Sequence, residues 1–189
     1  MRSGAVVDFD TKEIFSLPLE DILYSLAREF RFHGQSDCSV LQHSILTGMI
    51  ATRMRFNPLV VKHAYVHDFA EAFLRDVPTM IKGPEYNALE NEVYSKLMSF
   101  MGIPLLGGDD KDLLRQIDLH ARVVEAYYAF EDIGIYEAVV EEVQIDPIML
   151  MEAVMVWREV MDIEIFGEDG EVSDVVVSVF KQLLGRFNL

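Results

Sequence analysis

The chain has 189 residues, which is enough for one ordinary domain and short for two. With 51% hydrophobic and 25% charged residues it can bury a sizeable core, which excludes a disordered or fibrous protein. The 32 acidic residues against 16 basic ones give a net charge of -16, which repels polyanions, so we expect no long nucleic acid as a partner.

Helical spacing of apolar residues dominates the sequence from residue 19 onward. In chain order it predicts helices over 19–32, 39–54, 58–74, 84–101, 109–132, 135–143, 147–161 and 173–187. Asn57 and Asp146 each precede a proline and are predicted N-caps. Three glycines, Gly34, Gly102 and Gly134, are predicted to end helices.

The last predicted helix has an alternative, because its valines at 175, 176, 177 and 179 also suit a strand. A helix is favoured, since no second strand-like run exists to pair with that strand. No repeat of about 20 to 50 residues and no low-complexity linker divides the chain. We therefore predict one all-α domain over residues 1–189, a bundle of about seven to eight helices.

Cysteine content and hydropathy indicate the expected compartment. Cys38 is the only cysteine, so no disulfide can form within the chain. The first residues turn acidic before an apolar run of signal length develops, and no stretch approaches the roughly 18 apolar residues of a membrane span. We expect a cytoplasmic protein with no membrane partner.

Two histidines and two aspartates on predicted helices are candidates for a metal site. His43 lies on the second helix, His67 and Asp68 are adjacent on the third, and Asp118 lies between two apolar residues on the fifth. An acid on the inner face of a helix needs a buried partner, and crossing helices can bring such side chains to one ion. Imidazole and carboxylate ligands suit Zn, Mn, Co or Fe(II) and leave positions open for water and substrate.

The order of these residues and their neighbours resembles the HD-domain metal phosphohydrolases. The similarity covers about residues 17–128 and includes Arg31-Phe-His-Gly34, Ser39-Val-Leu-Gln-His43-Ser, His67-Asp68-Phe-Ala-Glu71-Ala, Asp76-Val-Pro78-Thr-Met-Ile-Lys82, and Asp118 with Glu125. Within that superfamily the chain is similar to the short subgroup of bacterial deoxyribonucleoside 5′-monophosphatases and phage-type enzymes, some of which are dATP triphosphohydrolases. Arg75 and Met80 depart from the glycine and proline usual in that subgroup.

The resemblance implies an HD-type bundle that hydrolyses a deoxynucleotide, either a 5′-monophosphate or a triphosphate, with a slight lean to deoxyadenylate. It implies that a divalent ion such as Co, Mn, Zn or Mg is bound by His43, His67, Asp68 and Asp118. It also places Arg31 on the substrate phosphate, and Glu71 and Asp76 beside the reacting water. These motifs fall within residues 31–125, and an acidic helical extension follows after about residue 134.

Further side chains are expected to complete the substrate site. Phosphoryl transfer needs positive charge to neutralise its anionic transition state. We expect this charge from Arg31, with Lys82 and Arg75 near it, and a pocket lining that includes His33 and Gln35.

Glu71 follows His67 by four residues. A continuous helix would place it about 5.4 Å further along the same face, where it can orient the water or take its proton. Asp76 can do the same from the following loop, or protonate the departing oxygen.

Plainer interpretations stay open for each of these residues taken alone: a core histidine, a solvated acid or a surface cation. His33, His63 and His120 are not expected to be ligands. For the whole chain, one rival function is a catalytically silent HD-like module that binds nucleotides or serves assembly. Another is an all-α partner-binding protein without metal.

The negative charge is distributed unevenly along the chain. Residues 1–82 hold nine basic and ten acidic residues, whereas residues 83–189 hold seven basic and 22 acidic ones. Most of the excess therefore lies outside the main motif region, which permits a site for a small phosphate ester. The apolar stretch 148–161 is wider than one buried helix face requires, and we expect it to form a homo-oligomer interface.

Overall fold

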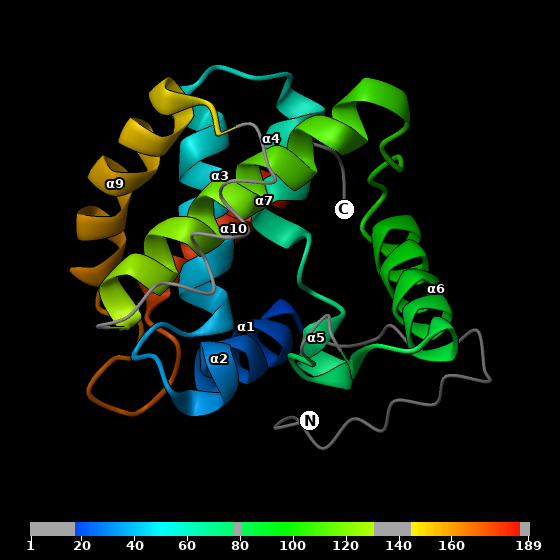
Figure 1. Cartoon of the computed structure of the whole chain (residues 1–189). Helices are drawn as coiled ribbons and strands as arrows, with labels where there is room; N and C mark the ends of the chain where they lie inside the picture. The colour runs from blue at the N-terminus through cyan, green and yellow to red at the C-terminus, as the bar shows by residue number, and fades with distance from the viewer. Residues whose placement is uncertain (1–17, 78–80, 131–144, 186–189) are drawn as a thin grey trace.

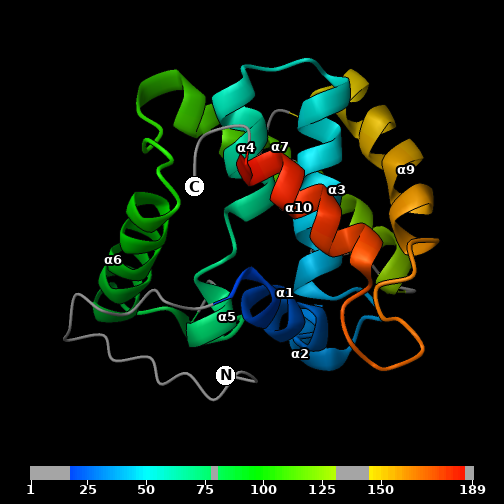
Figure 2. The same ribbon diagram turned by 180° about the vertical axis from the view of Figure 1, so that it is seen from behind.

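The structure, a computed structural model, describes residues 18–77, 81–130 and 145–185. These residues form helices, and the only β pairing among them consists of two isolated bridges. The helices, shown in Figures 1 and 2, are α1 (Leu19–Arg28), α2 (Arg31–Gly34), α3 (Val40–Arg53), α4 (Pro58–Val66), α5 (Glu71–Leu74), α6 (Pro84–Phe100), α7 (Gly108–Ala129), α9 (Pro147–Met161) and α10 (Asp174–Gly185). The predicted all-α bundle is confirmed.

Helix α3 is at the centre of the bundle. Eleven of its fourteen residues are buried, and it packs against α1, α4, α7 and α9. Ser39 caps the helix, because its hydroxyl accepts a hydrogen bond from the backbone N–H of Gln42 at 3.2 Å. The side chain of Gln42 in turn accepts from the backbone N–H of Ser39 at 2.9 Å. This reciprocal cap orders the first turn, which is the turn that carries His43.

Gly48 allows α3 and α4 to approach each other closely. A Cβ atom at this position would lie 2.3 Å from the ring of Tyr65 on α4, well inside van der Waals contact. Because α4 ends at Val66, the close approach also brings the next residue, His67, toward α3.

Two predicted helices are each broken in two, so these predictions were wrong in part. The helix predicted over 19–32 ends at Arg28, after which Glu29 is extended and Phe30 pairs with Ser39. The helix predicted over 58–74 stops at Val66, turns over residues 67–70 and resumes as α5. Apolar spacing continues across both breaks because both sides of each break face the same core, so periodicity alone does not reveal them.

The other predicted helices agree with the structure to within about three residues where the structure describes them. Asp146 caps α9 as expected, accepting hydrogen bonds from the backbone N–H groups of Ile148 and Met149 at 2.8 and 3.2 Å. The C-terminal valines lie in α10, which confirms the helical interpretation over the strand. The helix predicted over 135–143 lies outside the described residues.

The C-terminal helices share the core of the N-terminal ones. Helix α9 packs on α3 and α7. Helix α10 contributes Phe180, whose ring centroid lies 5.8 Å from that of Phe69 and 6.0 Å from that of Tyr65. No helix in the described ranges is long and apolar enough to cross a membrane.

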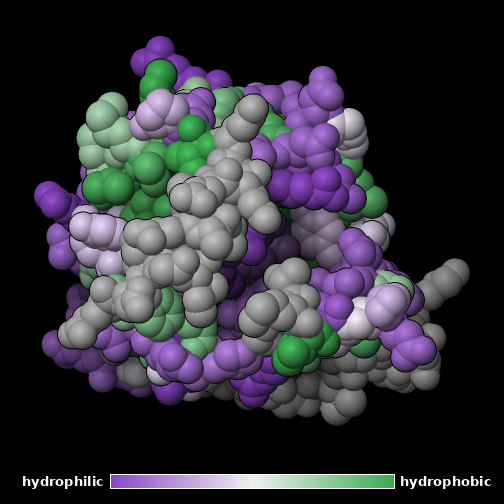
Figure 3. All heavy atoms as spheres, in the orientation of Figure 1, coloured by the Kyte–Doolittle hydropathy of each residue, from purple (hydrophilic) through white to green (hydrophobic). Residues whose placement is uncertain are grey.

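Part of the apolar surface of α9 is exposed. Ile148, Met151 and Met155 are exposed at helical spacing, and Figure 3 shows hydrophobic atoms gathered over this helix on the left of the face. The homo-oligomer interface expected here stays a prediction.

Candidate metal centre

Three predicted ligands meet where α3, α4 and α7 pack together. His43 from α3, His67 directly after α4 and Asp118 from α7 each place one ligand atom within 4.8 Å of the others, so the group can hold a metal ion. The Nε2 atom of His43 lies 3.2 Å from Nε2 of His67 and 3.1 Å from Oδ1 of Asp118. Atoms that bind one ion at about 2.1 Å are about 3.0 to 3.4 Å apart, so this spacing fits a metal centre.

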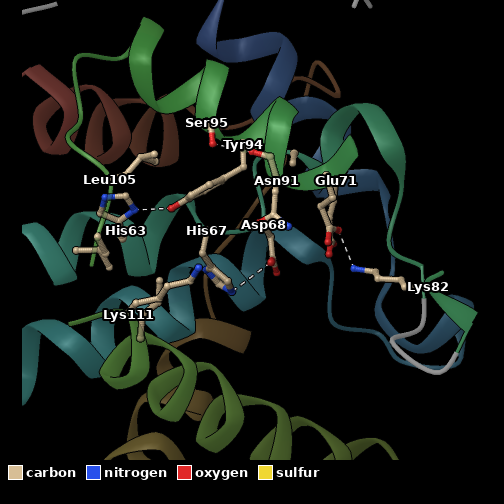
Figure 4. A pocket seen from close by; sticks show the side chains of 14 residues that line it. His63, His67, Asp68, Glu71, Lys82, Asn91, Tyr94, Ser95, Leu105 and Lys111 are labelled. Carbon is tan, nitrogen blue, oxygen red and sulfur yellow. Dashed lines mark hydrogen bonds and ion pairs between the residues drawn. The ribbon is translucent and has the colours of Figure 1, made fainter. Parts of the chain in front are cut away.

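Asp68, the fourth predicted ligand, lies at the same point. Its Oδ2 atom is 3.5 Å from Nε2 of His43, and its Oδ1 atom is 3.3 Å from Nε2 of His67. Figure 4 shows the side chains of His67 and Asp68 directed at each other. Adjacent residues on a helix point about 100° apart, and the turn over residues 67–70 lets both reach one place.

In both candidate ligands, His43 and His67, the ring nitrogen that faces away from the metal centre, Nδ1, lies close to an oxygen acceptor. Nδ1 of His43 lies 2.6 Å from Oε1 of Glu125, and Nδ1 of His67 lies 2.9 Å from the carbonyl oxygen of Ala64. When Nδ1–H donates to these oxygens, the Nε2 lone pair of each ring is free to bind a cation. Two such lone pairs facing each other repel unless a proton or a metal ion lies between them.

Helix α7 contributes two residues to which the sequence analysis assigned no role. Arg122 donates a hydrogen bond to Oδ2 of Asp118 at 2.7 Å. Glu125 is fully buried and contacts His43. Asp118, Arg122 and Glu125 follow one another at spacings of four and three residues, which places them on one face of α7. That spacing is a signal available in the sequence.

Arg31, the first residue of α2, lies against one side of the metal centre. Its guanidinium lies 3.5 Å from Glu125, 3.5 Å from Asp76 and 3.8 Å from Asp68, and its side chain is only 9% exposed. Burial lowers the pKa of Arg31, but these carboxylates outweigh burial and raise the pKa overall, so the group stays charged. Arg31, the residue predicted to bind the substrate phosphate, therefore lies beside the metal centre.

Glu71 lines the cleft beside the metal centre, although it does so from the start of α5 and not from one turn along a continuous helix with His67. Its Oε2 atom is buried without a hydrogen-bond partner among the described residues. Burial, together with the carboxylates of Asp68 and Asp76, raises the pKa of Glu71 well above its ordinary value. Glu71 is thereby suited to hold a proton near neutral pH.

Asp118 has the opposite shift. Burial raises the pKa of its carboxyl, but Arg122 and the two histidines outweigh burial and lower the pKa well below the ordinary value. Asp118 therefore stays ionised, as a metal ligand must.

The cleft that reaches the metal centre has a volume of about 300 Å³ (Figure 4). Lys82 lines it as predicted, and its ammonium group forms a 2.7 Å ion pair with Glu90 of α6. The sequence analysis missed most of the side of the cleft formed by α6, α7 and the connection between them, which is lined by Asn91, Tyr94, Ser95, Leu105, Leu106, Lys111 and Leu114.

Of the five predicted substrate residues only Lys82 lines this cleft: Arg31 lies against Asp68 without lining it, and the other three lie elsewhere. Arg75 has a side chain that is 68% exposed and pairs with Glu29 at the surface. His33 and Gln35 are exposed in and after α2, and neither lines the cleft.

The remaining histidines of the described core have both ring nitrogens occupied. His63 contacts the hydroxyl of Tyr94 and, at 2.8 Å, the carbonyl oxygen of Pro104. His120 lies 2.6 Å from the carbonyl oxygen of Gln116 and accepts from the N–H of Asp146 at 3.0 Å. Neither offers a free nitrogen to an ion.

No protein-family model matches this chain, and no curated protein sequence matches it. The HD-type resemblance therefore rests on the residues and their order in the sequence.

The first prediction concerns stability without metal. Burial lowers the pKa of His43, but Glu125 and Asp118 outweigh burial and raise it to about 9, above the ordinary value of 6.5. Because the folded pKa is the higher one, protonated His43 stabilises the fold fully below pH 6.5. This contribution, on the order of 3 kcal/mol, should be lost as the pH rises through about 9.

Urea unfolding in chelator across this pH range measures the loss. His33→Ala, which changes an exposed histidine outside the cluster, should keep the wild-type profile. His43→Gln should flatten it. If the free energy of unfolding of the wild-type protein does not fall as the pH rises from 6.5 to about 9, His43 is not protonated in the folded protein.

Proposed function

We propose that this chain is a divalent-metal-dependent phosphohydrolase of deoxynucleotides. The observation that carries the proposal is the convergence of Nε2 of His43, Nε2 of His67 and Oδ1 of Asp118, with both Nδ1 atoms held by oxygen acceptors. With Asp68 the donor set is two imidazoles and two carboxylates, which suits Mn, Co, Zn or Fe(II) and also admits Mg. The HD-type order of these residues supports the choice of reaction.

A divalent ion bound here supplies an acidified water as nucleophile and draws charge from a phosphoryl oxygen. Arg31 can donate paired hydrogen bonds to phosphate oxygens in exchange for one of its carboxylate contacts. Glu71, with its raised pKa, can take a proton from the nucleophilic water near neutral pH. The same proton can then pass from Glu71 to the departing oxygen, while Asp76, a carboxylate 3.5 Å from Arg31, orients the water. Lys82 adds positive charge to the cleft.

The substrate is a deoxynucleoside 5′-monophosphate or triphosphate, with a slight lean to deoxyadenylate. One centre serves both reactions, because the difference lies in which phosphorus atom the cleft brings to the nucleophile.

The second prediction is metal-dependent turnover. Protein purified without chelator and supplied with Mn, Co or Zn should bind close to one equivalent or more of metal. It should also hydrolyse members of a panel of deoxynucleoside mono- and triphosphates and ribonucleotides. Chromatography of the products identifies the reaction: phosphate alone indicates a monophosphatase, and intact tripolyphosphate indicates a triphosphohydrolase.

Two outcomes contradict the proposal. Failure to bind metal at near-stoichiometric levels removes the enzyme hypothesis and leaves an all-α partner-binding protein. Tight metal and nucleotide binding without turnover of any panel member leaves a catalytically silent HD-like binding or assembly module.

A further inference from the structure

The cleft beside the metal centre has an apolar wall formed by the connection between α6 and α7. Leu105 and Leu106 from this connection and Leu114 from α7 line it together. Leu105 is 54% exposed. Single exposed leucines are common on proteins, whereas several that line one cleft next to candidate ligands are typical of a binding site.

Hydrogen bonds hold the neighbouring part of this wall in place. The hydroxyl of Tyr94 on α6 contacts Nδ1 of His63, and Nε2 of His63 lies 2.8 Å from the carbonyl oxygen of Pro104. Figure 4 shows His63 and Tyr94 directed at each other above His67. Pro104 directly precedes Leu105, so His63 ties both α6 and the leucine-bearing connection to α4. The wall is therefore pre-formed, which lowers the entropic cost of binding a ligand.

Lys111 adds a cation to the same side of the cleft. It lies in the first turn of α7 and lines the cleft together with His67. Within the described ranges Lys111 has no ion pair, whereas Lys82 is paired with Glu90. An anionic group of a ligand can therefore bind Lys111 without displacing a carboxylate.

We propose that this wall binds the organic group of the substrate, a flat and largely apolar ring of nucleobase size, while the phosphate lies at the metal centre. The inference rests on the proposed function for the position of the phosphate. A volume of about 300 Å³ is at the lower end for ligand sites and is large enough for one ring and one sugar. The sequence analysis expected His33 and Gln35 in the pocket lining, but both lie outside the cleft.

Binding of two non-hydrolysable probes tests the inference on the full chain in Mn²⁺. One probe is the phosphonate analogue of deoxyadenosine 5′-monophosphate, and the other is methylphosphonate, which lacks the ring. Titration calorimetry should show at least about tenfold tighter binding of the nucleoside analogue. Leu105→Ser and Leu114→Asn should each weaken the analogue about five- to tenfold and leave methylphosphonate unchanged. Leu105→Ser alters an exposed side chain, so it keeps the test independent of folding.

His33→Ala is the matched control and should leave both affinities unchanged. Equal affinity of the two probes, an equal loss of both in the leucine variants, or weaker analogue binding only in His33→Ala would each overturn the inference. If the analogue binds through the leucines but wild-type protein releases neither phosphate nor tripolyphosphate from any nucleotide, the proposed function fails, whereas the inference that this wall binds the ring is supported.

Discussion

Asp118→Ala should remove metal binding and lower kcat/KM by at least about a thousandfold. A bound ion that generates the nucleophile and polarises the phosphoryl group contributes several kcal/mol, and each 1.36 kcal/mol corresponds to about a factor of ten. Asp118 supplies the carboxylate oxygen nearest to Nε2 of His43, at 3.1 Å, so no other described side chain replaces it. The same result is expected for His67→Ala.

The fold should survive this substitution. Arg122 loses its partner at 2.7 Å, but its side chain is 38% exposed and water can solvate it. Asp112→Asn is the matched control, because Asp112 lies on the same helix and pairs with Arg115 at 2.7 Å on the surface. It should keep wild-type metal content and turnover. Metal analysis, kinetics and circular dichroism together check the prediction, and full activity of Asp118→Ala contradicts the ligand set.

The helices that were predictable from sequence are those with a chemical signal at an end. Asp146 before Pro147 predicts the start of α9, and its carboxylate accepts the expected N–H groups. The two breaks lack such a signal. At Glu29 the chain leaves the helix because it pairs with the start of α3, where Val40 N–H donates to the carbonyl oxygen of Glu29 at 2.8 Å. A bond between segments eleven residues apart is invisible to a periodicity of 3.6 residues.

The candidate ligands were predictable for a different reason. Histidines and acids on otherwise apolar helix faces are costly unless they meet partners, so a bundle core must bring some of them together. The position of Asp68 could not be predicted in the same way, since a continuous helix would have directed its side chain away from that of His67. The turn that follows Val66 lets the two side chains meet.

Neighbours in sequence proved a poor guide to the substrate side of the cleft. Arg75 and Asp76 are adjacent, but Asp76 contacts Arg31 inside the cluster while Arg75 pairs with Glu29 at the surface. Arg75 has a φ of 72°, a left-handed backbone conformation that is uncommon for residues other than glycine and that an arginine in the sequence does not predict. Lys111 reaches the cleft only through the packing of α7 on α4, a contact between residues far apart in the chain.

Glu125→Gln should weaken metal affinity about 10- to 100-fold, although residue 125 touches no ion itself. Oε1 of Glu125 accepts from Nδ1 of His43 at 2.6 Å, which orients the ring and makes its Nε2 a stronger donor to metal. Glutamine keeps an acceptor oxygen but loses the negative charge. Competition titration with a chromogenic chelator measures the change.

Glu125→Ala should have an additional effect on stability. Glu125 lies 3.5 Å from Arg31, and both side chains are almost fully buried. Removing one partner of a buried ion pair costs about 3 to 5 kcal/mol, because the other charge is left uncompensated. Urea unfolding should therefore show a larger loss for alanine than for glutamine, since glutamine fills the same buried space and keeps an acceptor oxygen for Nδ1 of His43.

Comparing Glu71→Gln with Glu125→Gln distinguishes a residue that acts in the reaction from one that positions a metal ligand. Glu71 lines the same cleft and is also buried, and glutamine keeps its size but cannot take a proton from water. Metal affinity should therefore stay within about threefold of wild type while turnover falls by about 100-fold or more, the contribution expected of a general base. If Glu125→Gln binds metal as tightly as Glu71→Gln does, the contact between Glu125 and His43 serves only packing. A selective loss in Glu125→Gln shows that the buried acid on α7 tunes a metal ligand on α3.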